Sequence, residues 1–366
     1  MLQHTFNPTT MGWVRGLEAR GHRVLTLVAR DTEPHGGWPE DLKVVVVPDT
    51  VRWVAWLGER LLPGRSSAVY RLPDLRRLRR ELVRFEADAV LVKVYSLRNV
   101  LALLIALTLG IRRVGWIERV PPPNLEWRIL GRIGVLPRRM FTALDARPGG
   151  IAAPLDPPAG GMQVITYAPV LPEAVAAAPA PGTPIRVLTA AAFWDPEHKR
   201  PFWTLEAARD AGLLDGSCRF TFTGLGRENS ASLRMVRQLV DELEVGDLVD
   251  VRLNVPYAEM SAVYAAHHVL VLPSAWEQFG MVVPEAMAHG LVVVASDCIG
   301  SRGCVVPGVT GALFDTDDRD DLARVLRGLV DDPARIASIG AAAREFITLH
   351  AGPDVMAERL ERLLGS

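Results

Sequence analysis

The sequence is poor in the features that mark exported, membrane-spanning and disulfide-rich proteins. Its three cysteines are an odd number without metal-ligand spacing, so we expect reduced thiols rather than disulfides or zinc ligands. The N-terminus lacks the basic start and apolar run of a signal peptide. The longest apolar run, residues 100–111, is shorter than the roughly 20 residues that cross a bilayer. These absences predict a cytoplasmic protein.

The sequence also lacks a large net charge, but its charges are unevenly distributed. Residues 1–183 hold 24 Lys and Arg against 16 Asp and Glu, and residues 184–366 hold 17 against 26, so the halves carry +8 and −9. A basic half favours an anionic partner, such as a phosphorylated acceptor or an acidic membrane surface. Orientation within a dimer is the alternative. No nucleic-acid-binding signature surrounds the arginines, so we expect no nucleic-acid partner.

The sequence does contain short β-branched runs that alternate with amphipathic segments. This alternation is typical of parallel sheets covered by helices on both faces. It predicts strands near residues 23–28, 43–47, 89–94, 114–117, 163–167, 185–190, 219–223, 249–253, 269–272 and 291–296. It predicts helices near residues 11–21, 74–85, 98–109, 201–211, 231–243, 257–265, 281–289, 319–330 and 333–349.

The length and a break in this pattern predict two domains. A chain of 366 residues exceeds what one hydrophobic core usually supports. Residues 172–184 have no periodicity and are dominated by Pro and Ala. We therefore predict an α/β protein with two Rossmann-like, doubly wound parallel-sheet domains, residues 1–180 and 184–347, that face each other across a cleft. Ligands of such sheets bind beyond the carboxyl ends of the strands, so we expect the chemistry in that cleft.

The most informative stretch, residues 272–290, has the pattern of a strand end, a loop and a helix. Pro284 suits the first turn of a helix, and Gly290 suits the position just past its end. The helix is therefore bracketed, and its N-terminus must face the preceding loop.

The start of this predicted helix is suited to an anionic ligand with hydroxyl groups. Gly280 has no Cβ, so a ligand oxygen can approach the amides of Gly280, Met281 and Val282, where the helix dipole favours negative charge. Glu277 and Glu285 can accept hydrogen bonds from hydroxyls on either side of a diphosphate. A first-turn acid that only complements the helix dipole is the alternative for Glu285.

This stretch resembles the E-x(7)-E signature of retaining glycosyltransferases of the B fold, family 4, the glycosyl transferases group 1. Further matches in order and spacing lie at residues 224–226, 260–266, 291–297, 308–314, 332–335 and 340–345. The resemblance is dense in the C-terminal half. In the N-terminal half it rests on Gly12 and residues 17–24 and 88–92. The resemblance also implies that the last segment, residues 348–366, packs back on the first domain as a helix.

The resemblance implies a nucleotide-sugar donor held mainly by the C-terminal half. Glu285 would bind the ribose hydroxyls, and Glu277 would lie at the donor sugar and the reacting centre. Backbone from Phe279 through Gly280 and Met281 to Val282 would hold the sugar and phosphate.

Other family positions would complete the donor site. Loops at Gly224, Leu225 and Val255 would recognise the base. Gly12 would contact the donor in the first domain, although an ordinary loop glycine is the alternative.

The family's basic pair is only partly matched. Lys199 corresponds to the family's lysine, whereas residues 191–193 provide no arginine, so Arg200 is the available substitute. A cation at this point would stabilise the charge that develops on the departing diphosphate. We predict Lys199 and Glu277 as the catalytic residues.

The N-terminal half departs from the family because it has no histidine between His35 and His198. Lys93 or Tyr95 would supply polar contacts instead, and His4 is a further acceptor-side candidate. The resemblance still permits retention by a front-face route, in which the leaving phosphate removes the acceptor proton.

No metal or other cofactor is expected for the chemistry. Residues 315–318 contain an Asp-x-Asp that could suggest a metal site, but they stand before a predicted helix, where such acids cap. No strand is followed by a G-x-G-x-x-G turn, which argues against a dehydrogenase.

The expected function is the transfer of a sugar from a UDP- or GDP-linked donor to a hydroxyl acceptor that is anionic or lipid-linked. The basic residues within 71–84 and the Trp and Arg residues within 52–57 suit the headgroup region of an acidic membrane. A solvated helix face is the alternative. A silent sugar-nucleotide-binding partner protein and a sugar-nucleotide epimerase or hydrolase are the competing functions.

Overall fold

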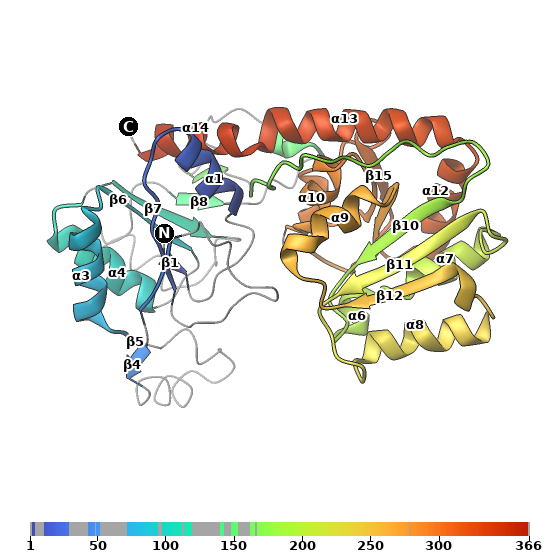
Figure 1. Ribbon diagram of the computed structural model, residues 1–366, viewed down its shortest axis with the longest axis horizontal. Helices are drawn as coiled ribbons and strands as arrows, with labels where there is room; N and C mark the ends of the chain where they lie inside the picture. Colours follow the sequence, from blue (N-terminus) through green and yellow to red (C-terminus); the bar gives the residue numbers. More distant parts are fainter. Residues whose placement is uncertain are drawn as a thin grey trace. The chain divides into compact units, whose positions relative to one another are not determined.

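The computed structural model describes residues 2–3, 11–28, 43–47, 49–51, 72–93, 97–111, 113–118, 140–142, 148–152, 162–164, 167–277 and 279–364. The chain divides into two compact units (Figure 1). Unit 1 comprises Met1–Ala143, Pro154–Thr166 and Met356–Ser366, and unit 2 comprises Leu144–Ala153 and Tyr167–Val355. Each unit is built around a parallel sheet.

The sheet of unit 1 has the strand order β3-β2-β1-β6-β7-β8-β9 with parallel pairing throughout. Its strands are β1 (Leu2–Gln3), β2 (Thr26–Val28), β3 (Val44–Val46), β6 (Ala89–Lys93), β7 (Arg113–Glu118), β8 (Met140–Thr142) and β9 (Met162–Val164). β4 (Asp49–Val51) and β5 (Leu72–Pro73) form an antiparallel pair. The helices are α1 (Met11–Ala19), α3 (Leu75–Phe85) and α4 (Leu97–Thr108), joined by the greater part of α14 (Pro353–Leu364).

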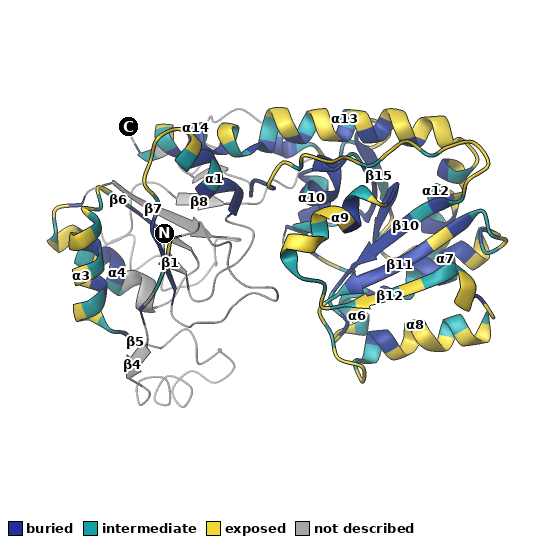
Figure 2. Cartoon of the chain, in the orientation of Figure 1, coloured by how far each residue is buried: buried dark blue, intermediate teal, exposed yellow. Residues whose placement is uncertain are grey.

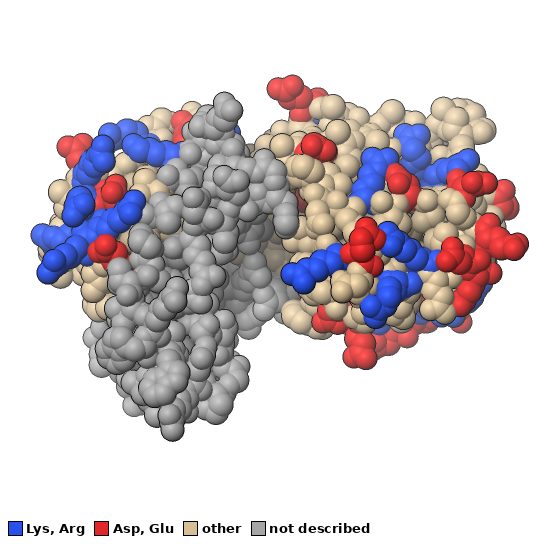
Figure 3. Space-filling model, turned by 60° about the horizontal axis from the view of Figure 1, so that its bottom comes forward, with Lys and Arg blue, Asp and Glu red and all other residues tan. Residues whose placement is uncertain are grey.

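Helix α3 carries one apolar face and one strongly basic face. Leu78 and Leu82 lie four residues apart and are buried in the core of unit 1. The solvent face holds Arg76, Arg79, Arg80 and Arg84, which are exposed. Lys and Arg side chains gather on this part of unit 1 (Figure 3). The helix is therefore stable as an amphipathic element and leaves a cluster of positive charge in water.

The sheet of unit 2 has the order β12-β11-β10-β13-β14-β15, again all parallel. Its strands are β10 (Ile185–Ala190), β11 (Cys218–Gly224), β12 (Val249–Leu253), β13 (Val269–Leu272), β14 (Val292–Ser296) and β15 (Gly311–Phe314). Numbered within the unit, this order is 3-2-1-4-5-6, the doubly wound arrangement. The chain therefore reverses its direction of growth between β10 and β13, where such sheets bind their ligands.

Helices cover both faces of this sheet. They are α6 (Pro196–Lys199), α7 (Trp203–Asp210), α8 (Ala231–Glu242), α9 (Met260–Ala265), α10 (Val282–Ala288), α11 (Ile299–Arg302), α12 (Arg319–Val330) and α13 (Pro333–Ala351), with the 3-10 turns η3 (Gly150–Ala152), η4 (Gly246–Leu248) and η5 (Tyr257–Glu259). Every residue of β13 and β14 is buried, and β10 beside them is also mostly buried (Figure 2). Continuous apolar strands of this kind are what a sheet covered on both faces requires.

Comparison with the predicted elements shows where the sequence pattern was sufficient. β10, β12 and β13 coincide with their predicted ranges, as does α12. α10 ends where expected, because Gly290 has φ of +80°, a conformation that glycine adopts at little cost. The pattern missed β4, β5, β8, β15, α6 and α11, which are two to four residues long and too short to show periodicity.

The segment between the two sheets packs on unit 2 earlier than the sequence break at residues 172–184 indicates. Tyr167 is buried and meets the ring of Phe279 edge to face at 5.1 Å. The Ala176 N–H donates to the carbonyl oxygen of His289 at 2.8 Å. At the chain's end, Glu361 of α14 accepts hydrogen bonds from Arg20 and His22 of unit 1. None of the described helices is long and apolar enough to span a bilayer.

Candidate active site

The carboxyl ends of β10 and β13 carry the residues that the sequence singled out in unit 2. β10 leads into α6, which ends at Lys199, and β13 leads into the loop that contains Glu277. The Ala275 N–H donates to the carbonyl oxygen of His198 at 2.7 Å, so the two connections are bonded to each other. The doubly wound topology thus joins segments that are 78 residues apart at the point where strand order reverses.

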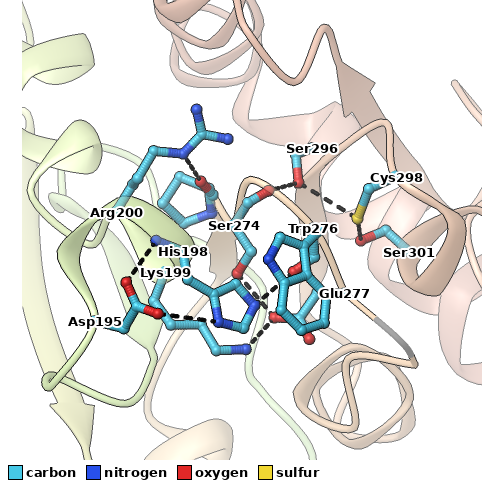
Figure 4. A network of polar contacts seen from close by, with 11 residues as sticks. Asp195, His198, Lys199, Arg200, Ser274, Trp276, Glu277, Ser296, Cys298 and Ser301 are labelled. Atoms are coloured by element: carbon cyan, nitrogen blue, oxygen red, sulfur yellow. Dashed lines mark hydrogen bonds and ion pairs between the residues drawn. The ribbon is translucent and has the colours of Figure 1, made fainter. Parts of the chain in front are cut away.

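Lys199 and Glu277 form an ion pair (Figure 4). The Lys199 Nζ lies 2.5 Å from the Glu277 Oε1, and the Ser274 Oγ donates to the same oxygen at 2.8 Å. Glu277 is only 8% exposed. A charge-assisted bond in a partly dry setting is stronger and shorter than one between neutral groups. The two predicted catalytic residues therefore lie together, with the second Glu277 oxygen outside these bonds.

The loop that bears Glu277 is supported from β14 and α11. The Ser296 Oγ donates to the carbonyl oxygen of Ser274 at 2.5 Å, and both serines are buried. A Cβ on Gly300 would lie 2.6 Å from both the Glu277 carbonyl oxygen and the Phe279 nitrogen. Only glycine allows this close approach of two backbones. Residues of β14 and α11 thus hold the Glu277 loop in place, and the E-x(7)-E motif does not reveal this support.

An aromatic pair borders the ion pair. His198 and Trp276 stack with ring centroids 4.0 Å apart and planes 6° from parallel, and the His198 Nε2 lies 2.8 Å from the Trp276 carbonyl oxygen. Trp276 keeps 53% of its surface exposed. Sequence reasoning assigned neither residue a role. Each of the two residues directly precedes a predicted catalytic residue in the sequence, and this position could have identified them.

Free backbone donors lie at the start of α10. Among the described residues, no acceptor bonds the N–H groups of Gly280, Met281 and Val282, whereas the Val283 N–H already donates to the Gly280 carbonyl oxygen at 2.8 Å. Gly280 has φ of +56°, which favours glycine. Phe279 is buried against Tyr167, so its side chain serves packing. The binding of a ligand oxygen by these three amides stays a prediction.

Glu285 has a different environment from Glu277. Its Oε2 accepts from the Tyr264 hydroxyl at 2.8 Å, and its Oε1 accepts from the Tyr257 hydroxyl at 3.4 Å. Burial raises the pKa of Glu285 to about 7, and the two hydroxyl donors oppose that rise. No cation bonds this carboxylate among the described residues. Glu285 is thus placed to exchange between its protonated and ionised forms near neutral pH.

Arg200 follows Lys199 but serves the protein interior. Its Nε donates to the Pro273 carbonyl oxygen at 3.1 Å, and its Nη2 donates to the Thr316 carbonyl oxygen at 2.9 Å. Its guanidinium lies over the ring of Trp203 at 4.1 Å, and burial lowers its pKa from the ordinary value. In Figure 4, Arg200 points away from Glu277. These contacts are structural, and donor binding by Arg200 stays a prediction.

The predicted base-recognition loops lie at the ends of β11 and β12. Gly224 comes so close to the chain that a Cβ there would lie 1.6 Å from the Ala191 carbonyl oxygen. Asn254, which sequence reasoning missed, clamps the loop because its Nδ2 donates to the Gly226 carbonyl oxygen at 2.9 Å. Leu225 is 40% exposed, and Val255 is half-buried. Contact of these loops with a base remains a prediction.

The predicted residues of unit 1 are less well defined. Gly12 is buried in the first turn of α1, and Lys93 is the last residue of β6. His4 and Tyr95 lie outside the described residues. The donor and acceptor roles of these four residues stay predictions.

The Asp-rich segment before α12 caps a helix, as predicted. The Asp318 side chain accepts from the Asp321 N–H at 3.0 Å, and the Asp321 carboxylate in turn accepts from the Asp315 N–H at 2.8 Å. Within the described part of the chain, no three His, Cys, Asp or Glu side chains are grouped so as to hold a metal ion.

Comparison with known proteins assigns residues 178–346 to the model of the glycosyl transferases group 1. D-inositol 3-phosphate glycosyltransferase 1 of Catenulispora acidiphila is 36% identical over 141 residues, which cover 38% of this chain and 33% of that protein. The D-inositol 3-phosphate glycosyltransferase of Thermobispora bispora is 37% identical over 109 residues, which cover 30% of this chain and 26% of that protein. The matched stretch thus spans no more than about a third of these relatives.

Solved structures match over nearly the whole chain. HepE of Anabaena, in complex with UDP and glucose, has a TM-score of 0.67 at 15% identity and covers 99% of this chain and 98% of its own. Sucrose-phosphate synthase of Thermosynechococcus elongatus has a TM-score of 0.63 at 18% identity and covers 95% and 90%. These likenesses show the fold, which is the two-unit B fold.

Proposed function

We propose that the protein transfers a sugar, with retention, from a nucleoside-diphosphate sugar to a hydroxyl acceptor, because residues 178–346 match the model of the glycosyl transferases group 1. The observation that carries this proposal is the Lys199–Glu277 ion pair, since Glu277 lies in the same connection as the amides of residues 280–282, which have no acceptor among the described residues. A cation, a carboxylate and amides at the start of a helix suit a phosphorylated sugar.

The proposed roles follow from where charge develops. Breakage of the sugar–phosphate bond places negative charge on the diphosphate, and Lys199 together with the amides of Gly280 and Met281 would stabilise it. Glu277 would accept hydrogen bonds from the donor sugar and compensate the positive character of its anomeric carbon. In a front-face route the departing phosphate takes the acceptor proton, so the chain needs no separate base. No step here requires a metal.

Glu285 would accept hydrogen bonds from the ribose hydroxyls. Its carboxylate is already held by Tyr257 and Tyr264, which leaves it oriented before the ligand arrives. The solved HepE complexes contain UDP or UDP-glucose, which supports a uridine-linked donor as the first choice over a guanosine-linked one.

The acceptor is proposed to be a cytoplasmic hydroxyl compound that is anionic or lipid-linked. The relatives named above act, by their names, on inositol 3-phosphate, a phosphorylated polyol. The exposed arginines of α3 give unit 1 a positive surface that would attract such an acceptor or an acidic membrane.

Turnover of UDP-glucose tests the central proposal. We expect slow release of UDP without acceptor, faster release with inositol 3-phosphate, and loss of both in Glu277→Ala. Tight UDP-glucose binding without any turnover would favour a silent binding protein. A rearranged sugar nucleotide or a free sugar as the sole product, with acceptor present, would favour an epimerase or hydrolase.

Sedimentation with vesicles tests the membrane contact separately. Vesicles that contain phosphatidylserine should co-sediment the protein at low salt and release it at high salt, since exposed charges are screened. Reversal of Arg76, Arg79 and Arg80 to Glu should abolish co-sedimentation without altering UDP affinity. Absence of co-sedimentation in the unaltered protein would leave a soluble acceptor as the proposal.

A further inference from the structure

A cavity lies in unit 2, at the end of the sheet opposite to the Lys199–Glu277 pair. It has a volume of about 510 Å³ and is enclosed by residues 175–179 and one side of α13. His268 and Gly290, which also line it, stand just before β13 and β14. The cavity therefore meets the amino ends of the strands, whereas the donor site uses their carboxyl ends. Its size is that of a small-molecule site.

The wall of this cavity is mainly apolar. Val175, Ile336 and Leu349 contribute branched side chains, and the rest of the wall is chiefly Ala and Pro. Leu349 keeps 58% and Val175 keeps 39% of its surface exposed. Apolar groups that remain exposed around a concavity gain free energy when an apolar ligand covers them.

His268 adds a hydrogen-bond donor without an acceptor. The ring is 2% exposed, and its Nδ1 accepts from the Arg186 N–H at 3.0 Å. Burial, followed by the charge of Arg186, lowers the pKa of His268 to about 4, so the ring is neutral at pH 7. Since Nδ1 is an acceptor, the ring hydrogen belongs to Nε2. Nε2 has no partner among the described residues, and an orphaned buried donor is costly.

A cation stands at the rim. Arg344 is exposed on α13, lines the cavity, and makes no ion pair in the described part of the chain. Burial lowers the pKa of His289, and the positive charge of Arg344 lowers it further. Glu345 also borders the cavity, at the next position of the helix. The cavity lining thus combines an apolar floor, a cation and a carboxylate at the rim, and a histidine whose buried Nε2 has no acceptor among the described residues.

We propose that this cavity binds a small carboxylate with an aliphatic body, seated on Val175, Ile336 and Leu349, with its carboxylate between the Arg344 guanidinium and the His268 Nε2–H. A free fatty acid and a larger molecule that ends in an aliphatic carboxylate share this chemistry. The site is separate from the donor site and needs no turnover to be tested.

Octanoate is a suitable probe, with octan-1-ol as the matched neutral molecule. We expect octanoate to bind at one equivalent with millimolar or better affinity and to shift the His268 side-chain nitrogen signals, and octan-1-ol to bind about tenfold more weakly. Arg344→Gln, an exposed substitution, should weaken octanoate to the level of octan-1-ol. An octanoate that carries a bulky group at its terminal carbon, compared with octanoate, distinguishes the carboxylate end of a larger molecule from a free acid.

Steric blockade provides the matched control. Ala337 and Ala334 are both exposed on α13, but only Ala337 lines the cavity. Ala337→Trp should abolish octanoate binding, whereas Ala334→Trp should leave it unchanged. Glu277→Ala should bind octanoate like the unaltered protein, which separates this site from the donor site. Absence of octanoate binding, or binding that survives both Arg344→Gln and Ala337→Trp, overturns the proposal.

Discussion

The loop around Glu277 and the first turn of α10 around Glu285 place two carboxylates in opposite settings, although they are eight residues apart. Glu277 accepts from a lysine and a serine, whereas Glu285 accepts from two tyrosine hydroxyls and is not bonded to a cation in the described structure. Burial without an adjacent cation favours the neutral form of a carboxylate. Burial accordingly raises the pKa of Glu285 to about 7.

This difference indicates separate tasks within one proposed donor site. A carboxylate that is fixed next to a cation suits a reacting centre, where charge must be present at every turnover. A carboxylate that titrates near neutrality suits recognition, since ligand hydroxyls supply the bonds that stabilise its charge. If the tasks are separate, changes at Glu277 reduce the rate of transfer and changes at Glu285 reduce donor affinity.

The largest effect is expected for Glu277. Glu277→Gln keeps the size of the side chain but removes its charge, and Glu277→Ala removes both. We expect kcat to fall by about 1,000-fold in each, because an electrostatic group at the reacting centre is lost, while UDP affinity changes little. Steady-state transfer and calorimetric binding of UDP measure the two quantities.

A fall of kcat by less than tenfold in Glu277→Gln would mean that the charge is dispensable. The distinction between the two carboxylates would then rest on shape. An unchanged melting temperature in both variants is needed to assign their effects to the site.

Lys199 should rank second, and its neighbour Arg200 provides a matched comparison. Lys199→Met removes the cation nearest the developing charge, so we expect kcat to fall by about 100-fold at an unchanged melting temperature. Arg200→Met removes the bonds to two carbonyl oxygens and the contact with Trp203, so we expect a lower melting temperature instead.

The contrast fails if folded Arg200→Met loses transfer as strongly as Lys199→Met. In that case Arg200 would act on the donor as the family resemblance implies. Assays well below the melting temperature of Arg200→Met keep loss of fold apart from loss of function.

The pattern of residues predicted the elements of unit 2 closely, for a physical reason. β10, β12 and β13 lie at the ranges expected because continuous β-branched runs have few stable conformations other than strands. α6 escaped prediction because Pro196 and the cap Asp195 define it within four residues. β15, with Gly311 in its first position, carries no strong strand signal and is stabilised by its pairing with β14.

The E-x(7)-E spacing indicated Glu277 and the family resemblance indicated Lys199, but the contact between them arises from the order of strands in space. The sequence did not predict that the Lys199 and Arg200 side chains point in different directions. Arg200 has φ of +43°, in the left-handed region, so the chain turns there and the two basic side chains diverge. Tyr257 and Tyr264 lie 28 and 21 residues before Glu285 and belong to no motif that pairs them with it.

The third prediction concerns the pH dependence of donor affinity. The pKa of Glu285 is raised to about 7, so the carboxylate is mainly protonated at pH 6 and mainly ionised at pH 8. Ribose hydroxyls donate best to the ionised form, so we expect UDP-glucose affinity to rise by about tenfold over this interval. UDP-glucose is the ligand of choice for this measurement, because its diphosphate, unlike that of UDP, does not ionise between pH 6 and pH 8.

Glu285→Gln is the control for this profile, and its UDP-glucose affinity should be low and flat with pH. The pH dependence of stability is a second test of the raised pKa. Because the pKa of Glu285 is higher in the folded protein, its protonation stabilises the fold fully below pH 4.5, the ordinary pKa value, and this stabilisation is lost as pH rises through about 7. Chemical denaturation should therefore show a decline in the free energy of unfolding across that range that Glu285→Gln lacks.

The smallest effects are expected from the two tyrosines, and their order is informative. The Tyr264 hydroxyl lies 2.8 Å from Glu285 and the Tyr257 hydroxyl lies 3.4 Å away, and both hold its pKa below the value that burial alone would give. Tyr264→Phe should move the midpoint of the affinity profile to higher pH and weaken UDP-glucose a few-fold at pH 7, with a smaller change in Tyr257→Phe. The absence of a shift in both variants, or a shift to lower pH, would mean that the hydroxyls do not stabilise the carboxylate and that Glu285 is set apart from Glu277 by burial alone.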